Sequence, residues 1–225
     1  MTLKLVIFDV DGTLVDSQAD IVASMQAGFA AVGKTAPLRD EILGIVGLSL
    51  PLAVARLAPE EDPQTHGVMA DAYKANYAAR REAAGEHASS PLYPHVREVL
   101  EALHARPDWL LGIATGKSRR GLNRLVDEHD LRRLFVTQHC ADDHPSKPHP
   151  AMLQAALADA GVAPEAAVMV GDTSFDMEMA QAAGVHGIGV SWGYHPLDRL
   201  GAARSMIDDI RALPGLLQTL WEIAA

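Results

Sequence analysis

The chain has 225 residues, of which 48% are hydrophobic, and its formal net charge is −10 at pH 7. A chain of this length can bury a sizeable core, either as one large domain or as a core with a smaller companion. The acidic balance, without any Lys/Arg-rich run, argues against nucleic acid or an anionic membrane as the main partner. No uncharged apolar segment is long enough to span a bilayer, and the single cysteine, Cys140, is compatible with a reducing compartment. We therefore expect a cytoplasmic protein that binds neither nucleic acid nor a membrane.

The first apolar run predicts a strand that ends in two carboxylates. Residues 3–10 are almost all apolar, as in a parallel strand buried on both faces, and Asp9 and Asp11 stand at its end. Alternate strand side chains share a direction, and the carboxyl ends of strands form the ligand crevice in open α/β sheets. Two close carboxylates repel each other, so the pair requires a cation or a shared proton. Gly12 and Thr13 would let backbone N–H groups approach an anion there.

The next stretch predicts helices without a strand. Asp16 and Ser17 offer N-cap chemistry for a helix that ends at Gly33, and short helices follow at 39–45, 50–57 and 64–81. The simplest alternative is a few extra helices packed on a sheet edge. We favour an inserted α-helical cap domain, residues 17–89, over an α/β core domain formed by residues 1–16 and 90–225.

From residue 95 onward, strands alternate with helices, which predicts a doubly wound parallel, Rossmann-like sheet. The predicted helices are 95–104, 119–129, 151–160, 174–183 and a terminal one, and the predicted strands are 109–114, 134–139, 166–170, 186–190 and a short one at 205–207.

Thr115 and Gly116 follow the second predicted strand and precede a helix whose free N–H groups favour an anion. A hydroxyl at this place can donate to a phosphate oxygen, although an ordinary helix N-cap is the alternative. The surrounding residues 112–118, GIATGKS, have three residues between the glycines where a nucleotide P-loop requires four. A P-loop is therefore rejected.

Lys147 lies in the segment SKPHP, where prolines stiffen the loop before a helix. Such a lysine is a point charge suited to a phosphate or an anionic nucleophile, although an exposed loop lysine is the plainer interpretation.

The segment 168–176 contains another apolar strand that ends in a carboxylate, Asp172. Asp176 follows four residues later, where a helical turn brings it near Asp172. A few carboxylates with open positions suit Mg²⁺, whereas helix capping is the structural alternative.

Four motifs together resemble those of the haloacid dehalogenase superfamily: DVDGT from Asp9, Thr115, KPHP from Lys147, and GDTSFD with Asp172 and Asp176. The helical insert and the segments GTLVDS and SWGYH are most similar to phosphoglycolate phosphatases of its first subfamily. The resemblance implies that Asp9 is the nucleophile that forms an aspartyl-phosphate and that Asp11 is the general acid and base. It also implies phosphate binding by Gly12, Thr115, Gly116 and Lys147. The implied Mg²⁺ ligands are Asp9, Asp172, the Asp11 carbonyl, and Asp176 as a ligand or an orienting group.

The expected function is therefore Mg²⁺-dependent hydrolysis of a small phosphorylated metabolite such as phosphoglycolate, by a monomer or homodimer. A dehalogenase lacks the second acid, so Asp11 argues against it. A hexose-phosphate mutase keeps that acid, but its cap loop offers polar groups where residues 44–52, GIVGLSLPL, are apolar. The mutase and a non-catalytic phosphate-binding protein remain the alternatives.

Overall fold

The computed structural model describes residues 2–83 and 90–223. Its centre is a six-stranded sheet in the order β3-β2-β1-β4-β5-β6, with every neighbouring pair parallel. The strands are β1 Lys4–Phe8, β2 Trp109–Thr115, β3 Thr137–Cys140, β4 Ala167–Gly171, β5 His186–Val190 and β6 Ser205–Ile207. The order reverses at β1, so the predicted doubly wound sheet is confirmed.

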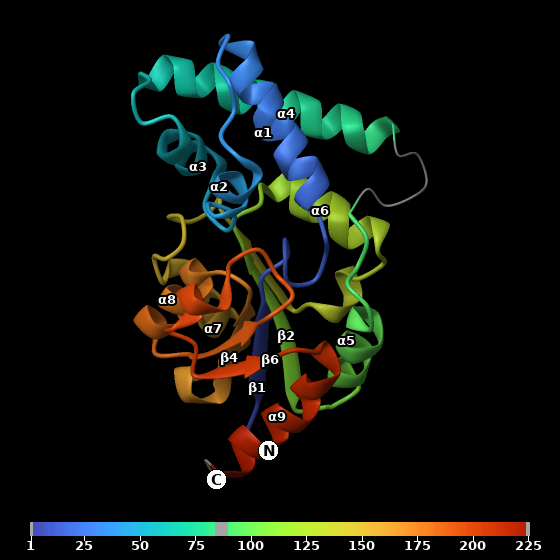
Figure 1. Cartoon of the computed structure of the whole chain (residues 1–225). Coiled ribbons are helices and arrows are strands. Elements are labelled where there is room, and N and C mark those ends of the chain that lie inside the picture. The colour runs from blue at the N-terminus through green and yellow to red at the C-terminus, as the bar shows by residue number, and fades with distance from the viewer. Residues whose placement is uncertain (1, 84–89, 224–225) are drawn as a thin grey trace.

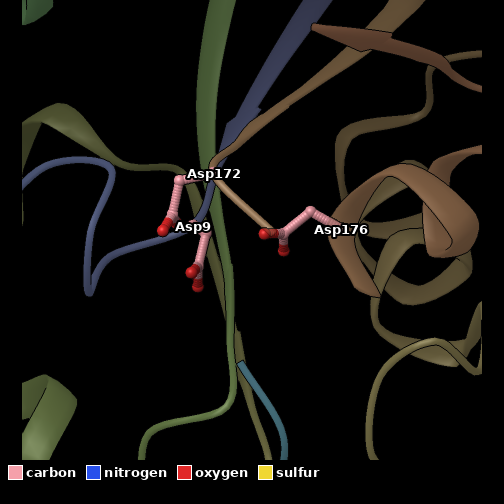
Figure 2. A group of neighbouring side chains, drawn as sticks. All are labelled: Asp9, Asp172 and Asp176. Atoms are coloured by element: carbon pink, nitrogen blue, oxygen red, sulfur yellow. The ribbon is translucent and has the colours of Figure 1, made fainter. Parts of the chain in front are cut away.

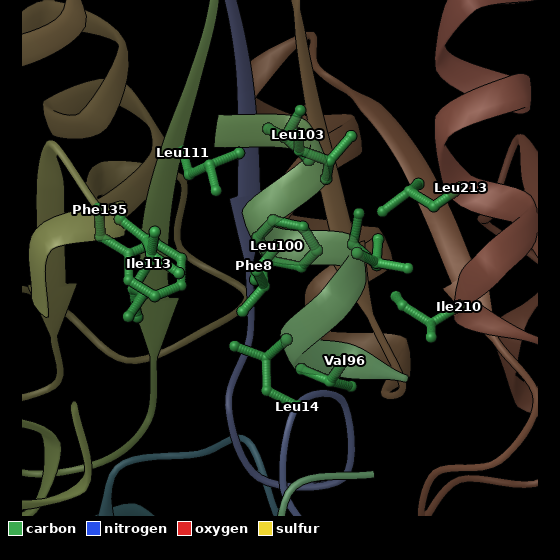
Figure 3. Close-up of a cluster of buried hydrophobic side chains, with 14 of the residues drawn as sticks. Phe8, Leu14, Val96, Leu100, Leu103, Leu111, Ile113, Phe135, Ile210 and Leu213 are labelled. Carbon is green, nitrogen blue, oxygen red and sulfur yellow. The ribbon is translucent and has the colours of Figure 1, made fainter. Parts of the chain in front are cut away.

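Helices cover both faces of the sheet (Figure 1). On one face lie α5 (Val96–His104), α6 (Arg119–Glu128) and α9 (Leu213–Ile223), and on the other lie α7 (Ala151–Ala160) and α8 (Ser174–Ala183). The alternation of side chains along β1 explains this layering, because Val6 and Phe8 join the first cluster and Leu5 and Ile7 the second. Figure 3 shows Phe8 among the side chains of α5 and β2.

Four further helices lie beyond the carboxyl ends of the strands (Figure 1). They are α1 (Gln18–Ala31), α2 (Arg39–Leu43), α3 (Leu50–Leu57) and α4 (Pro63–Ala83). They bury a hydrophobic cluster of their own, which includes Met25, Phe29, Ile42, Val54 and Met69. The division into a core and a cap domain stays a prediction, and its second boundary, between residues 89 and 90, falls at the segment 84–89, outside the described residues.

Two local predictions are wrong. The strand expected at 134–139 begins only at Thr137, because the N–H of Leu134 donates to the carbonyl of Leu131 in a 3₁₀ turn. Ser17 stands at the N-cap position of α1 but makes no capping bond, because its hydroxyl donates to the Asp11 carboxylate instead.

Candidate active site

Three buried carboxylates meet at the carboxyl edge of the sheet (Figure 2). Asp9 follows β1 and Asp172 follows β4, and the pairing of Phe8 with Val170 places these strand ends side by side. Asp176 lies in the first turn of α8 and faces back toward them. One oxygen from each carboxylate lies within 4.8 Å of the others. The adjacent ends of β1 and β4 and the first turn of α8 thus bring Asp9 close to Asp172 and Asp176, which lie more than 160 residues later in the sequence.

Lys147 neutralises part of this charge. Its ammonium lies 2.7 Å from Asp9 Oδ1 and 2.6 Å from Asp176 Oδ1, and its side chain is completely buried. Burial lowers the pKa of this amine, but the carboxylates of Asp176 and Asp9 outweigh that effect and hold the pKa above its ordinary value. The position of Lys147 excludes the plainer interpretation of an exposed loop lysine.

Without a further cation, the acids carry more negative charge than Lys147 can balance. Burial raises the pKa of Asp9 to about 7, against the opposing effect of Lys147. Burial and the carboxylate of Asp176 raise the pKa of Asp172 as well. The Oδ2 atom of Asp9 is buried and has no hydrogen-bond partner among the described residues. Three carboxylates with a free oxygen fit a hard divalent cation, which prefers oxygen ligands.

Neighbouring groups fix the orientation of Asp172. Its Oδ1 accepts from the Thr13 hydroxyl at 2.9 Å, and its Oδ2 accepts from the Tyr194 backbone N–H at 2.8 Å. Gly12 packs against the same carboxylate with φ at 85°, and a Cβ at this position would lie 2.2 Å from Asp172 Oδ2. The glycine of the first motif is therefore needed for both its backbone conformation and the close approach of Asp172.

Asp11 lies apart from the acidic cluster and has a different partner. Its side chain pairs with Lys117, whose ammonium lies 2.7 and 2.8 Å from the two carboxylate oxygens. Both side chains are nearly buried, at 12% and 8% exposure. The Lys117 ammonium also donates to the Tyr77 hydroxyl of α4 at 3.3 Å. Neither Lys117 nor Tyr77 was predicted as a site residue, and the only signal in the sequence is the lysine within GIATGKS.

Thr115 and Gly116 lie at the end of β2, on the wall of a cavity of about 560 Å³ that also reaches Asp9 and Asp11. Thr115 is buried, and Gly116 lies against the α2–α3 loop, where a Cβ would come 2.4 Å from the Gly47 carbonyl oxygen. Apolar side chains of the wall include Ile21 and Met25 of α1, Leu48 of the α2–α3 loop and Tyr73 of α4, and α6 contributes Arg124. Of the predicted phosphate-binding residues, Thr115 and Gly116 thus face a cavity whose other walls come in part from the helical insert.

Fold and site together define an α/β enzyme whose polar groups converge at the carboxyl ends of its central strands. The family model of haloacid dehalogenase-like hydrolases matches residues 6–190. The chain therefore belongs to this family, as its four motifs predicted.

Curated relatives agree with this assignment. The chain is 35% identical to a phosphoglycolate phosphatase of Pseudomonas savastanoi, over 98% of this chain and 82% of that protein. A phosphoglycolate phosphatase of Pseudomonas fluorescens is 34% identical over the same shares. The prediction that the chain is an enzyme, a phosphatase of this family, is confirmed.

Solved structures show the same fold. A haloacid dehalogenase-like hydrolase of Streptococcus pneumoniae superposes with a TM-score of 0.81 at 24% identity, covering 95% of this chain and 98% of that one. A hydrolase of Pseudomonas syringae gives a TM-score of 0.81 at 23% identity, covering 95% of this chain and 97% of that one.

No helix in residues 2–83 and 90–223 combines the length and the apolar character needed to cross a bilayer. The cytoplasmic location and the monomeric or homodimeric state stay predictions.

Proposed function

We propose that the protein hydrolyses a small phosphorylated metabolite, phosphoglycolate or a similar compound, through an aspartyl-phosphate at Asp9. The observation that supports this most strongly is the placement of Asp9, with Lys147 at 2.7 Å and the carboxylates of Asp172 and Asp176 beside it. The relatives named phosphoglycolate phosphatase support the substrate class. We also propose that residues 17–89 act as a cap that covers the cavity.

In the first step, the Asp9 carboxylate attacks phosphorus while the bond to the leaving-group oxygen breaks. Asp11, in its protonated form, donates its proton to that oxygen. Lys117 donates to both oxygens of Asp11, and we propose that this contact opens when substrate binds. An oxygen of the incoming substrate is the natural new partner for the Lys117 ammonium.

In the second step, Asp11 takes a proton from water, and the resulting hydroxide attacks phosphorus and releases inorganic phosphate from Asp9. Lys147 and the Thr115 hydroxyl stabilise charge on the phosphoryl oxygens. Asp9, Asp172, Asp176 and the Asp11 carbonyl would hold a divalent cation, which we propose to be Mg²⁺. When bound, this cation neutralises negative charge on the transferred group.

The test is phosphate release from a panel of phosphoglycolate, sugar phosphates and nucleoside monophosphates, with Mg²⁺ and with chelator. We expect turnover only with the metal, and a loss of at least about a thousandfold in Asp9→Asn because the nucleophile is gone. Asp16→Asn is the matched control, since Asp16 follows the same strand but binds Gln18 outside the cluster. Equal turnover by Asp9→Asn and wild type would refute the proposal. Isomerised sugar phosphate without phosphate release would identify a mutase instead.

A further inference from the structure

A buried arginine in the wall of the cavity has no role in the proposed reaction. Arg81, near the end of α4, is 4% exposed and lines the same cavity as Asp9 and Asp11. Its Nη2 contacts Glu128 of α6, while its Nε and Nη1 are buried and have no hydrogen-bond partner among the described residues. The guanidinium is always charged in proteins, and buried donors without an acceptor cost free energy. The site therefore suits an acceptor that these residues do not supply.

The charges around Arg81 are also unbalanced. Glu128 accepts from both Arg81 and Arg124, whose Nε lies 2.8 Å from Oε1. Arg124 lines the cavity as well. The guanidinium groups of Arg81 and Arg124 thus share the single carboxylate of Glu128. These contacts leave one positive charge in excess at this end of the cavity. A carboxylate or phosphate of a ligand would complement it, because both bind arginine through several hydrogen bonds.

The position of Arg81 points to the leaving-group side of the site. Tyr77 and Arg81 are four residues apart on α4, so they share a face and lie about 6 Å apart along the helix axis. The guanidinium lies over the Tyr77 ring, 5.8 Å from its centre. The Tyr77 hydroxyl in turn contacts Lys117, the partner of Asp11. Figure 1 shows this end of α4 above α6, and the contact of Arg81 with Glu128 joins the two helices.

We propose that Arg81 is a specificity-determining residue that binds a second anionic group, a carboxylate or a phosphate, on the leaving group of the substrate. The apolar side chains of the wall, such as Met25 and Tyr73, would contact the carbon chain between the two anionic groups. The cavity of about 560 Å³ leaves room for carbon chains longer than that of glycolate. This inference rests on the proposed phosphatase function and names a residue that selects its substrate.

The test compares matched substrates in one assay. Phosphate esters of hydroxycarboxylates with two to six carbons are paired with neutral alkyl phosphates of equal length, and alkanediol bisphosphates form a third arm. For the wild type, we expect kcat/KM to be at least about tenfold higher for the best anionic compound than for its neutral partner. In Arg81→Met this ratio falls toward one, and in Arg81→Lys part of it returns. The carboxylate and bisphosphate arms show which anion is preferred.

Lys74→Met is the matched control, because it removes one positive charge from the same helix and cavity. The Lys74 side chain is 62% exposed and paired with Asp71, so we expect the ratio to remain. If circular dichroism shows that Arg81→Met is unfolded, Arg81→Gln decides, because its amide can still donate to Glu128. A wild-type ratio near one, or an unchanged ratio in the neutral variants, overturns the role of Arg81 while the phosphatase function stands. Absence of turnover of every compound by the wild type overturns the function itself.

Discussion

At the scale of single residues, the site is a balance of buried charges. The Lys147 ammonium lies within ion-pair distance of both Asp9 and Asp176, and all three side chains are almost inaccessible to water. In such surroundings an unpaired charge costs several kcal/mol, so each member depends on the others. The proposed cation would add positive charge to this balance before a phosphate dianion approaches.

Replacing Lys147 by methionine tests this balance. The substitution leaves buried carboxylates without their cation, so we expect the free energy of unfolding at pH 7 to fall by about 3–5 kcal/mol. Urea unfolding followed by circular dichroism measures the change. Lys34→Met is the control, because Lys34 is 49% exposed in its pair with Glu61 and should contribute less than about 1 kcal/mol. Equal losses of unfolding free energy in the two variants would show that the buried carboxylates do not depend on the Lys147 ammonium.

At the scale of elements, the beginning of α8 positions Asp176. The Thr173 hydroxyl accepts from the Asp176 N–H, and the Asp176 carboxylate accepts from the Thr173 N–H at 3.0 Å, which together form a capping box. A loop after β5 adds a second support, because His195 Nδ1 accepts from the Ser174 N–H at 3.1 Å. The His195 ring also packs edge-on against Phe175. The first turn of α8 thus links Asp176, a proposed metal ligand, to a distant loop.

His195 makes this support dependent on pH. Burial, together with the charge of Arg199, lowers the pKa of His195 from 6.5 to about 4. Between these values the unfolded chain binds the proton more readily than the folded one, so His195 stabilises the fold above pH 6.5 and this contribution is lost as the pH falls toward 4. We expect it to be on the order of 2 kcal/mol.

The measurement is chemical unfolding of the wild type and His195→Asn between pH 4 and 7.5. Asparagine keeps an acceptor for the Ser174 N–H but does not titrate. The difference in the free energy of unfolding between the two proteins should therefore shift in favour of the variant as the pH falls below 6.5. A difference that stays constant over this range would contradict the account.

The elements could be predicted from sequence largely because apolar strands end in polar residues here. Asp9 and Asp172 were recognisable since each follows a buried run, and parallel strands place their carboxyl ends together. Lys117 could not be found in this way, because its partner Asp11 is 106 residues away and no local period indicates the contact. Arg81 was hidden for a similar reason, since its burial depends on how α4 lies over α6. Periodicity predicts elements, whereas contacts between elements depend on their packing.

At the scale of the whole molecule, the helical insert and the sheet supply different parts of one cavity. The carboxyl ends of β1 and β2 contribute Asp9 and Thr115, while α1 and α4 contribute apolar side chains and Arg81. Direct contacts join the two parts, including the Ser49 N–H, which donates to the Ser146 hydroxyl at 2.8 Å. Under the proposed function, chemistry and selectivity belong to separate segments, so the leaving-group preference could change without alteration of the acidic cluster.

The central claim is that Asp9 becomes phosphorylated, and the most direct test is to trap that intermediate. In Asp11→Asn the base for the second step is lost, while acetyl phosphate still reacts because its acetate leaving group needs no proton. We predict that acid-quenched Asp11→Asn with Mg²⁺ and acetyl phosphate contains one phosphoryl group on the peptide with Asp9, detected by mass spectrometry, and that Asp9→Asn contains none. Phosphate release without any phosphorylated peptide, or a phosphoryl group on another residue, would contradict the account.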